Sequence, residues 1–277
     1  MISELCTHDL ASGRTEVVLR HEGVVEAPNW HRDGWLLVNG EGRLFRVPLD
    51  APALHPLETG GIEGCNNDHG FSPDGRLIAF SAKGRTGASC IYTMPAAGGP
   101  PRRLTPLTPS WWHGWSPDGS RHAYAAARDG GPVLPHLCDA DGHGERPLAQ
   151  GFDHADGPDW SADGRRVWFN GEREGRVDLW RVSPDGTDLQ RMTGGDGVDW
   201  FPHPSPDGAQ VLFLRYPPGT AGHPANLPVS LMLLPQDGGP AQEVLRLDGT
   251  HRGGQGTINV PPWRPDGRAF AFVRFVP

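Results

Sequence analysis

The sequence lacks long hydrophobic runs. None of its segments comes near the roughly 18 consecutive apolar residues that a membrane-spanning helix requires. Its first residues, Met1 to Cys6, have neither the positive charge nor the apolar segment of a secretion signal. We therefore expect no membrane partner. As given, the chain is expected to be cytoplasmic, and periplasmic only if a signal was trimmed from it.

Basic residues are also scarce. The 25 Lys and Arg residues are outnumbered by 33 Asp and Glu, which leaves a net charge of -8, and no basic stripe stands out. Proteins that bind DNA or RNA need such a stripe to meet the phosphate backbone. Nucleic acid is therefore excluded as an expected partner.

Only four cysteines are present among the 277 residues, at positions 6, 65, 90 and 138. They form no CxxC pair or other metal-binding spacing, and three of them fall in predicted strands, so we expect buried free thiols. Several catalytic motifs are missing as well. The sequence contains no G-x-S-x-G elbow, P-loop or dinucleotide fingerprint, and the glycines around Gln255 lack the helix that a phosphate cradle needs.

Glycine and proline are abundant, with 39 and 29 residues, and they fall in periodic turns between apolar runs. Six times a hydrophobic or proline residue leads into a short turn that ends in Asp-Gly. The six glycines follow one another at steps of 41, 44, 45, 44 and 59 residues. The six copies are 30–34 (WHRDG), 71–75 (FSPDG), 115–119 (WSPDG), 160–164 (WSADG), 204–208 (PSPDG) and 263–267 (WRPDG).

A period in the forties with four short strands per unit is typical of a propeller. The sequence therefore predicts an all-β, six-bladed β-propeller of four-stranded antiparallel blades, in one domain over residues 1–277. The last copy has room for only two strands, so we expect the N-terminal strands to complete it and close the ring. The expected blades are approximately 24–60, 66–106, 110–150, 155–194, 198–247, and 255–277 together with 1–20.

The repeat resembles that of the TolB-like propellers, which reads W-S-P-D-G followed by a strand, a Gly turn, an I-Y strand and L-T. The resemblance covers nearly the whole chain, and copies two to four are nearest to it. The segments 66–70 (NNDHG), 111–114 (WWHG) and 199–204 (DWFPHP) resemble a stand-alone, TolB-like group of bacterial proteins. This resemblance implies the propeller fold. It does not extend to the N-terminal domain of TolB, so the contacts of TolB with envelope proteins are not implied.

The two faces of such a propeller should differ. The Asp-Gly turns repeat one structural element on one face. On the other face, non-repetitive polar residues precede the inner strands and should surround the mouth of the central channel. The positions five residues before the turn serine, or its equivalent, are Glu26, Asn67, Trp111, Asp156, Trp200 and Asn259.

Histidines, carboxylates and one glutamine should gather at this mouth. His69, His113, His203 and Gln255 are candidate ligands for a divalent metal such as Mn, Ca or Zn, with Asp68, Asp156, Asp159 and Asp199 nearby. The same residues could equally line a polar channel that holds water or a ligand without a metal. Both interpretations stay open at the level of sequence.

The step of 59 residues indicates an insertion in blade five, from Tyr216 to Pro228, which contains His223. We expect it to overhang the same mouth as a lid or wall, because long loops in compact domains tend to be functional. Trp111, Trp112, Trp200 and Phe201 lie in linkers, where each could stack on a sugar ring or pack between blades. Four basic residues on this rim are candidates to receive a carboxylate or phosphate, namely Lys83, Arg85, Arg128 and Arg173.

The propeller is also similar to the oligogalacturonate lyases, which implies a manganese ion held by His69, His113, His203 and Gln255. By this resemblance the predicted catalytic residues are His113, Asp156 and Asp199, acting in β-elimination on a uronate or keto-sugar. The predicted ligand contacts are Glu26, Asn67, Asp68, Trp111, Trp112, Asp159, Trp200, His223 and Asn259. The alternative is a non-enzymatic, TolB-like propeller that binds a glycan, or a protein partner, without turnover.

Overall fold

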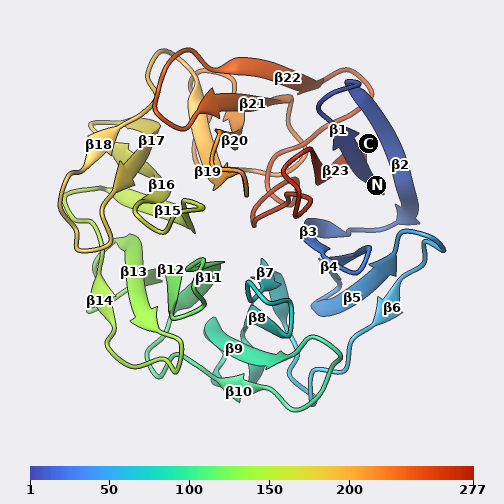
Figure 1. The fold of residues 1–277 in the computed structure, drawn as a ribbon, viewed down its shortest axis with the longest axis horizontal. Coiled ribbons are helices and arrows are strands. Elements are labelled where there is room, and N and C mark those ends of the chain that lie inside the picture. The colour runs from blue at the N-terminus through green and yellow to red at the C-terminus, as the bar shows by residue number, and fades with distance from the viewer.

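The computed structural model describes residues 1–277, the side chain of Arg85 excepted. Six β-sheets stand around a central axis as the blades of a propeller (Figure 1). Neighbouring strands of a blade pair antiparallel. In blade two, for example, the four strands follow one another in chain order from the centre of the ring to its rim. This architecture confirms the predicted fold.

The first three blades follow one another along the chain. Their strands are β3 (Glu26–His31), β4 (Trp35–Gly40), β5 (Arg43–Pro48) and β6 (His55–Pro56); β7 (Cys65–Phe71), β8 (Leu77–Ala82), β9 (Cys90–Pro95) and β10 (Arg102–Arg103); and β11 (Ser110–Trp115), β12 (Arg121–Ala127), β13 (Val133–Asp139) and β14 (Arg146–Pro147). A single 3-10 turn, η1 (Gly84–Thr86), lies between β8 and β9.

Blades four and five continue this order. Their strands are β15 (His154–Trp160), β16 (Val167–Arg173), β17 (Arg176–Val182) and β18 (Gln190–Arg191), followed by β19 (Val198–Pro204), β20 (Gln210–Tyr216), β21 (Val229–Pro235) and β22 (Gln242–Leu247). The sixth blade combines both ends of the chain in β1 (Ile2–Asp9), β2 (Arg14–Glu22) and β23 (Ala269–Val276).

The ring closes as the sequence predicts. Strand β1 pairs with β23 along its whole length, from Ile2 opposite Val276 to Asp9 opposite Ala269. The two termini therefore lie in one blade (Figure 1). In place of a full inner strand, two isolated bridges join the preceding segment to β23, from Trp263 to Phe270 and from Arg252 to Phe275.

The second strand of each blade is the most apolar because the neighbouring blades cover both of its faces. All six residues of β4 are buried, and Leu212, Phe213 and Leu214 in β20 are fully buried. Apolar clusters join adjacent blades, as where Leu137 of β13 packs in one cluster with Phe169 of β16. Burial of this apolar surface supplies the main stabilisation of the ring.

The Asp-Gly turns are alike in all six blades. In each, the glycine N–H donates to the carbonyl three residues earlier, at 2.8 to 3.1 Å. The glycine φ angles lie between 69° and 77°, a region that residues with a side chain adopt only at a cost. The repeat thus encodes a turn.

The four cysteines are free and buried, in strands β1, β7, β9 and β13. Burial raises the pKa of Cys6, Cys65 and Cys138 to about 12, so these thiols are unreactive at neutral pH. Among the described residues, no helix is both long and apolar enough to cross a membrane.

Candidate functional site

A cavity of about 210 Å³ lies at the mouth of the central channel, on the face opposite the Asp-Gly turns. It receives side chains from blades two to five and from the segment before β23. The lining residues are Asn66, Asn67, Asp68, Trp111, His113, Val133, His154, Asp156, Phe201, His223, Gln255 and Asn259.

Irregular inner strands build this cavity. The register of β3, β7, β11, β15 and β19 shifts against the second strand of each blade, for example between Asp156 and Asp159. A bulge bends its strand and redirects side chains. The residue after position 26, 156 or 200 has a positive φ in blades one, four and five, and in blade five this residue is Phe201. These bends leave the first halves of the inner strands free to present polar groups to the mouth.

Asp156 of β15 lies between two imidazoles. Its Oδ1 is 2.9 Å from Nε2 of His113, and its Oδ2 is 3.8 Å from Nε2 of His154. Burial by itself raises the pKa of Asp156, but His113 and His154 outweigh burial and hold this pKa well below its usual range. Asp156 is therefore ionised at neutral pH.

His113 responds in the opposite direction. Burial by itself lowers the pKa of His113, but the carboxylates of Asp156 and Asp68 outweigh it, so this pKa is raised above 6.5. Contact with Asp156 also raises the pKa of His154. The three side chains form an ion-paired cluster in the wall of the cavity.

Asp68 of β7 lies in the same wall, and Nδ2 of Asn66 donates to its Oδ2 at 2.6 Å. Burial raises the pKa of Asp68 to about 7, the charge of His113 partly offsets this rise, and Asp156 and Glu26 add to it. Asp68 and Asp156 are thus two carboxyl groups of one cavity with strongly different proton affinities.

The insertion of blade five covers one side of the cavity. His223 packs on Trp200 and Phe201, with ring centroids 4.3 and 5.1 Å apart. The carbonyl of Pro224 accepts from the hydroxyl of Tyr216 at 3.1 Å. The insertion reaches the mouth of the channel, as expected, because its residue His223 lines the cavity.

Two of the four predicted metal ligands lie elsewhere, between blades. Nδ1 of His69 is 2.7 Å from Oδ1 of Asn29, and burial lowers the pKa of His69 to about 3, so the neutral ring donates through this nitrogen. His203 contacts two acceptors, Oδ2 of Asp159 at 3.0 Å and the carbonyl of Ile258 at 2.7 Å. The rings of His69 and His203 therefore make polar contacts that link neighbouring blades.

His113 and Gln255 line the cavity, but the predicted set of four ligands does not converge. Among the described residues, no group of three or more His, Cys, Asp or Glu side chains is arranged to hold a metal ion. The residues present do not fit the manganese centre that the lyase resemblance implies. The structure therefore identifies none of the four as a metal ligand.

Three predicted carboxylates do not line the cavity. Asp199 accepts two hydrogen bonds from Arg215, at 2.7 and 2.9 Å, and Asp159 pairs with His203. Glu26 accepts from Nδ2 of Asn39 at 3.1 Å. Their hydrogen-bond and ion-pair partners lie within or between the blades, and none of the three is a lining residue of this cavity.

The predicted aromatic residues also differ in whether they line the cavity. Trp111 is half-buried and lines the cavity. Trp112 is buried and donates to Nδ1 of His122 at 3.0 Å, and Trp200 is buried beneath His223. Of these three tryptophans, Trp111 is the one that lines the cavity.

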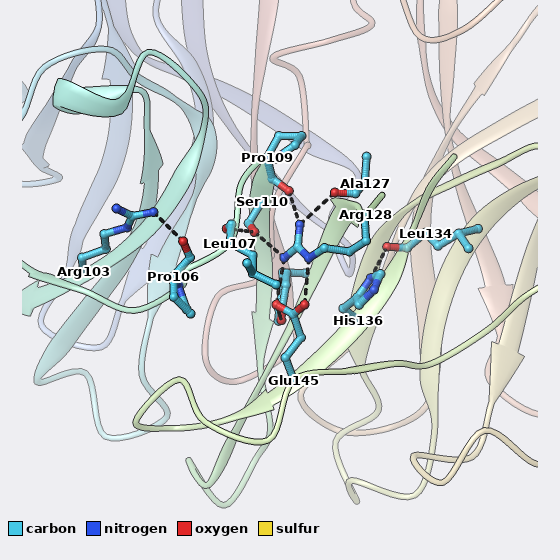
Figure 2. A network of polar contacts seen from close by, with 11 residues as sticks. Arg103, Pro106, Leu107, Pro109, Ser110, Ala127, Arg128, Leu134, His136 and Glu145 are labelled. Atoms are coloured by element: carbon cyan, nitrogen blue, oxygen red, sulfur yellow. Dashed lines mark hydrogen bonds and ion pairs between the residues drawn. The ribbon is translucent and has the colours of Figure 1, made fainter. Parts of the chain in front are cut away.

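The basic rim residues have partners of their own. Arg128 donates to both carboxylate oxygens of Glu145, at 2.7 and 2.8 Å, and to the carbonyl of Pro109 (Figure 2). Arg173 donates to the carbonyl of Gly151, and Lys83 is exposed. The side chain of Arg85 lies outside the described residues. The rim thus has no observed anion-binding cluster in the part that is described.

Sequence reasoning missed three lining residues, namely Asn66, Val133 and His154, whereas Phe201 was among the predicted aromatic candidates. One signal could have found His154. It stands two residues before Asp156 on the same strand, and alternate residues of a strand point to the same face. Val133 begins β13, directly after the turn between the second and third strands of blade three.

Comparisons with known proteins give close relatives and distant ones. No protein-family model matches the sequence. An uncharacterised protein of Agrobacterium fabrum is 43% identical over an alignment of 280 positions, which covers 100% of this chain and 94% of that protein. The solved structure of a candidate TolB from Agrobacterium tumefaciens is 43% identical and covers 100% of this chain and 99% of that one, with a TM-score of 0.96.

Two more distant structures share the fold. TolB from Acinetobacter baumannii is 17% identical, covers 92% of this chain and 64% of that one, and gives a TM-score of 0.70. An oligogalacturonate lyase in complex with manganese is 12% identical, covers 99% of this chain and 91% of that one, and gives a TM-score of 0.58. At these identities the likeness concerns the propeller alone.

Proposed function

This chain belongs to the family of TolB-like six-bladed β-propellers. We propose that it binds a small carbohydrate, of the size of one sugar ring, in the cavity at the mouth of its central channel. A propeller supplies the frame, and its function depends on the residues that decorate it.

The observation that carries the proposal is a group of buried polar atoms without partners in this cavity. Nδ1 of His113 and Nδ1 of His223 are buried and make no hydrogen bond, and Nε2 of His154 has only its ion-pair contact with Asp156 at 3.8 Å. Buried polar atoms in native proteins are nearly always hydrogen-bonded. A polar molecule held in the cavity would supply the missing partners.

The other lining residues suit a sugar. Hydroxyl groups both donate and accept hydrogen bonds, and the side-chain amides of Asn66, Asn67, Asn259 and Gln255 can do the same. The half-buried ring of Trp111 offers an apolar face beside them, on which the C–H face of a sugar ring can pack.

The size of the cavity limits the ligand. Its volume of about 210 Å³ is below the roughly 300 to 1,000 Å³ of pockets that hold drug-sized molecules. One sugar ring is therefore favoured over an oligosaccharide enclosed as a whole. A longer glycan would enter with one end.

The test is a binding titration, by calorimetry or ligand-observed NMR, with a panel of monosaccharides and short oligosaccharides. Replacement of the stacking residue, Trp111→Ala, should weaken binding on the order of 10-fold. Gln255→Ala should also weaken it, whereas the exposed Gln150→Ala serves as the matched control and should not. The proposal is wrong if no saccharide binds, or if binding is the same in Trp111→Ala and Gln255→Ala as in the unaltered protein.

A further inference from the structure

Two groups that can exchange protons lie in the cavity together with a third that orients one of them. Asp68 comes from blade two, His113 from blade three and Asp156 from blade four. Nε2 of His113 is 2.9 Å from Oδ1 of Asp156, while Nδ1 of His113 makes no well-aligned hydrogen bond. The backbone of Asn259 also favours the protonated form of His113. An imidazole paired with a carboxylate on one nitrogen and free on the other is the arrangement of a general acid or base held in place by an orienting group.

The composition of the cavity restricts the chemistry that such groups could support. Its described lining residues include no Ser, Thr, Cys or Lys, so none of these common nucleophiles is available to form a covalent intermediate. Its volume of about 210 Å³ suits one sugar ring and leaves little room for a second. A reaction within a single ring, driven by one acid and one base, meets both conditions.

We propose that Asp68 and His113 interconvert the two anomers of the bound sugar, with Asp156 as the positioning residue for His113. This inference rests on the proposed carbohydrate binding, because the reaction requires a sugar ring in the cavity.

The step is balanced without a further reactant. The Asp68 carboxylate takes the proton of the anomeric hydroxyl, and the bond between the anomeric carbon and the ring oxygen breaks. The ring oxygen receives the electron pair of that bond and the proton of the His113 imidazolium. The product is the open-chain aldehyde, with Asp68 protonated and His113 neutral, and the reverse transfers close the ring on the other face.

Electrostatics supports these roles. Asp156 stabilises the protonated form of His113, and the pKa of Asp68 near 7 lets its carboxylate accept a proton near neutral pH. The groups that face Asp68 are Glu26, His113 and Asp156, and His154 and His223 complete the set around Asp156. Because these sites interact, the pH dependence belongs to the cluster as a whole.

The experiment measures anomer exchange of D-glucose, D-galactose, D-mannose and L-arabinose by NMR magnetisation transfer, with and without the protein. Exchange of at least one sugar that binds should be faster than its spontaneous rate. Asp68→Asn and His113→Gln should each reduce this acceleration about 100-fold or more. Asp74→Asn is the matched control, since Asp74 lies in the same blade at the other end of the channel, and it should leave the rate unchanged.

Asp156→Asn tests the positioning role. It should shift the alkaline limb of the pH profile to lower pH, because His113 loses the carboxylate that keeps it protonated. A purely structural role would lower the rate at all pH values without moving the profile.

The possible results separate the two proposals. If sugars bind but none exchanges faster, the inference is wrong and the proposed binding stands. If none of the sugars binds, the inference and the proposed function are both wrong. If folded Asp68→Asn and His113→Gln proteins, checked by thermal melting, keep the full rate, the assigned roles are wrong.

Discussion

The two ends of the central channel are built on the same inner strands but differ in what they repeat. At one end, six turns share one backbone hydrogen bond and glycine φ angles within a few degrees of one another. At the other, the equivalent positions hold six residues of four types, from glutamate to tryptophan. Every blade needs the same tight turn, so the same Asp-Gly residues recur at that end. The end with the cavity has no such shared requirement, and its residues can therefore serve a specific function.

The aspartates of the two ends illustrate this difference. Asp118, in an Asp-Gly turn, accepts from Ser116 Oγ and Ser120 N, and these hydrogen bonds lower its pKa to about 2. Asp68, at the cavity, has a pKa raised to about 7, chiefly by burial. One residue type is thus a charged cap at one end and a titratable group near neutrality at the other.

Removal of residues 1–20 should have the largest effect, because it destroys the frame that both ends share. It deletes β1 and most of β2, including Leu5 and Cys6, which are buried in the core, and it exposes the edge of β23. We expect loss of cooperative unfolding, measured by circular dichroism during heating, together with aggregation on a sizing column. A monomeric variant with a sharp melting transition would contradict the importance of ring closure.

A pair of glycine substitutions should distinguish the ends next. A Cβ atom at Gly254 would lie 2.1 Å from the carbonyl oxygen of Pro224, at a φ of +109°. Gly254→Ala should therefore destabilise the protein by about 3 kcal/mol or more, from backbone strain and overlap together. At Gly208, in an Asp-Gly turn, the nearest atom is 3.7 Å away and only the φ of +72° is strained, so Ala there should cost about 1 kcal/mol.

Denaturant unfolding measures both variants. Equal losses of stability would mean that the blade-five insertion does not pack against the segment around Gly254. Gly254→Ala should also weaken sugar binding, because the same segment carries Gln255 into the cavity.

The contrast between the ends also explains what the sequence could predict. Six turns with a regular spacing specify the number of blades, and the incomplete last copy specifies ring closure. Counting back from the turn serine found Asn67, Trp111, Asp156 and Asn259 at the cavity, because these positions follow the same repeat.

The same count failed where non-repetitive segments intervene. Glu26 is covered by the chain at Gly256, where a Cβ atom would lie 2.6 Å from Oε1 of Glu26, and Trp200 is covered by His223. The histidines at 69 and 203 were placed at the mouth by sequence, yet their partners are in neighbouring blades, such as Asn29 and Ile258. Contacts between blades depend on three-dimensional packing that no local pattern records.

Acid should reveal a further difference, between two buried histidines of blade three. His113 is stabilised in its protonated form by Asp156, whereas His122 accepts from Trp112 and burial lowers its pKa to about 3. Because the folded pKa of His122 is below the unfolded value, the unfolded state binds more protons between about pH 6.5 and 3. Stability is therefore retained above about pH 6.5 and lost as the pH falls, by about 1.4 kcal/mol per pH unit for this group.

His122→Gln checks this assignment, since the glutamine carbonyl can accept from Trp112 without titrating. Denaturant unfolding at pH 7 and pH 4.5 should show a smaller loss of stability in the variant than in the unaltered protein. An identical loss would mean that other groups account for the sensitivity to acid.

The smallest effect is expected at the repeated end, where six turns share one task and each contributes little. Asp118→Ala removes the acceptor for Ser116 Oγ, Ser120 N and Ser120 Oγ. Ser120 is exposed, so its groups can bond to water instead, whereas the hydroxyl of Ser116 is buried. The cost should be about 1 kcal/mol, seen as a fall of about 2 to 4 °C in melting temperature. Asp118→Asn keeps an acceptor oxygen and should recover most of it. Sugar binding at the far end should be unchanged in both variants, because a defect in one exposed turn leaves the inner strands in place; a parallel loss of binding would show that the two ends are coupled through the blade.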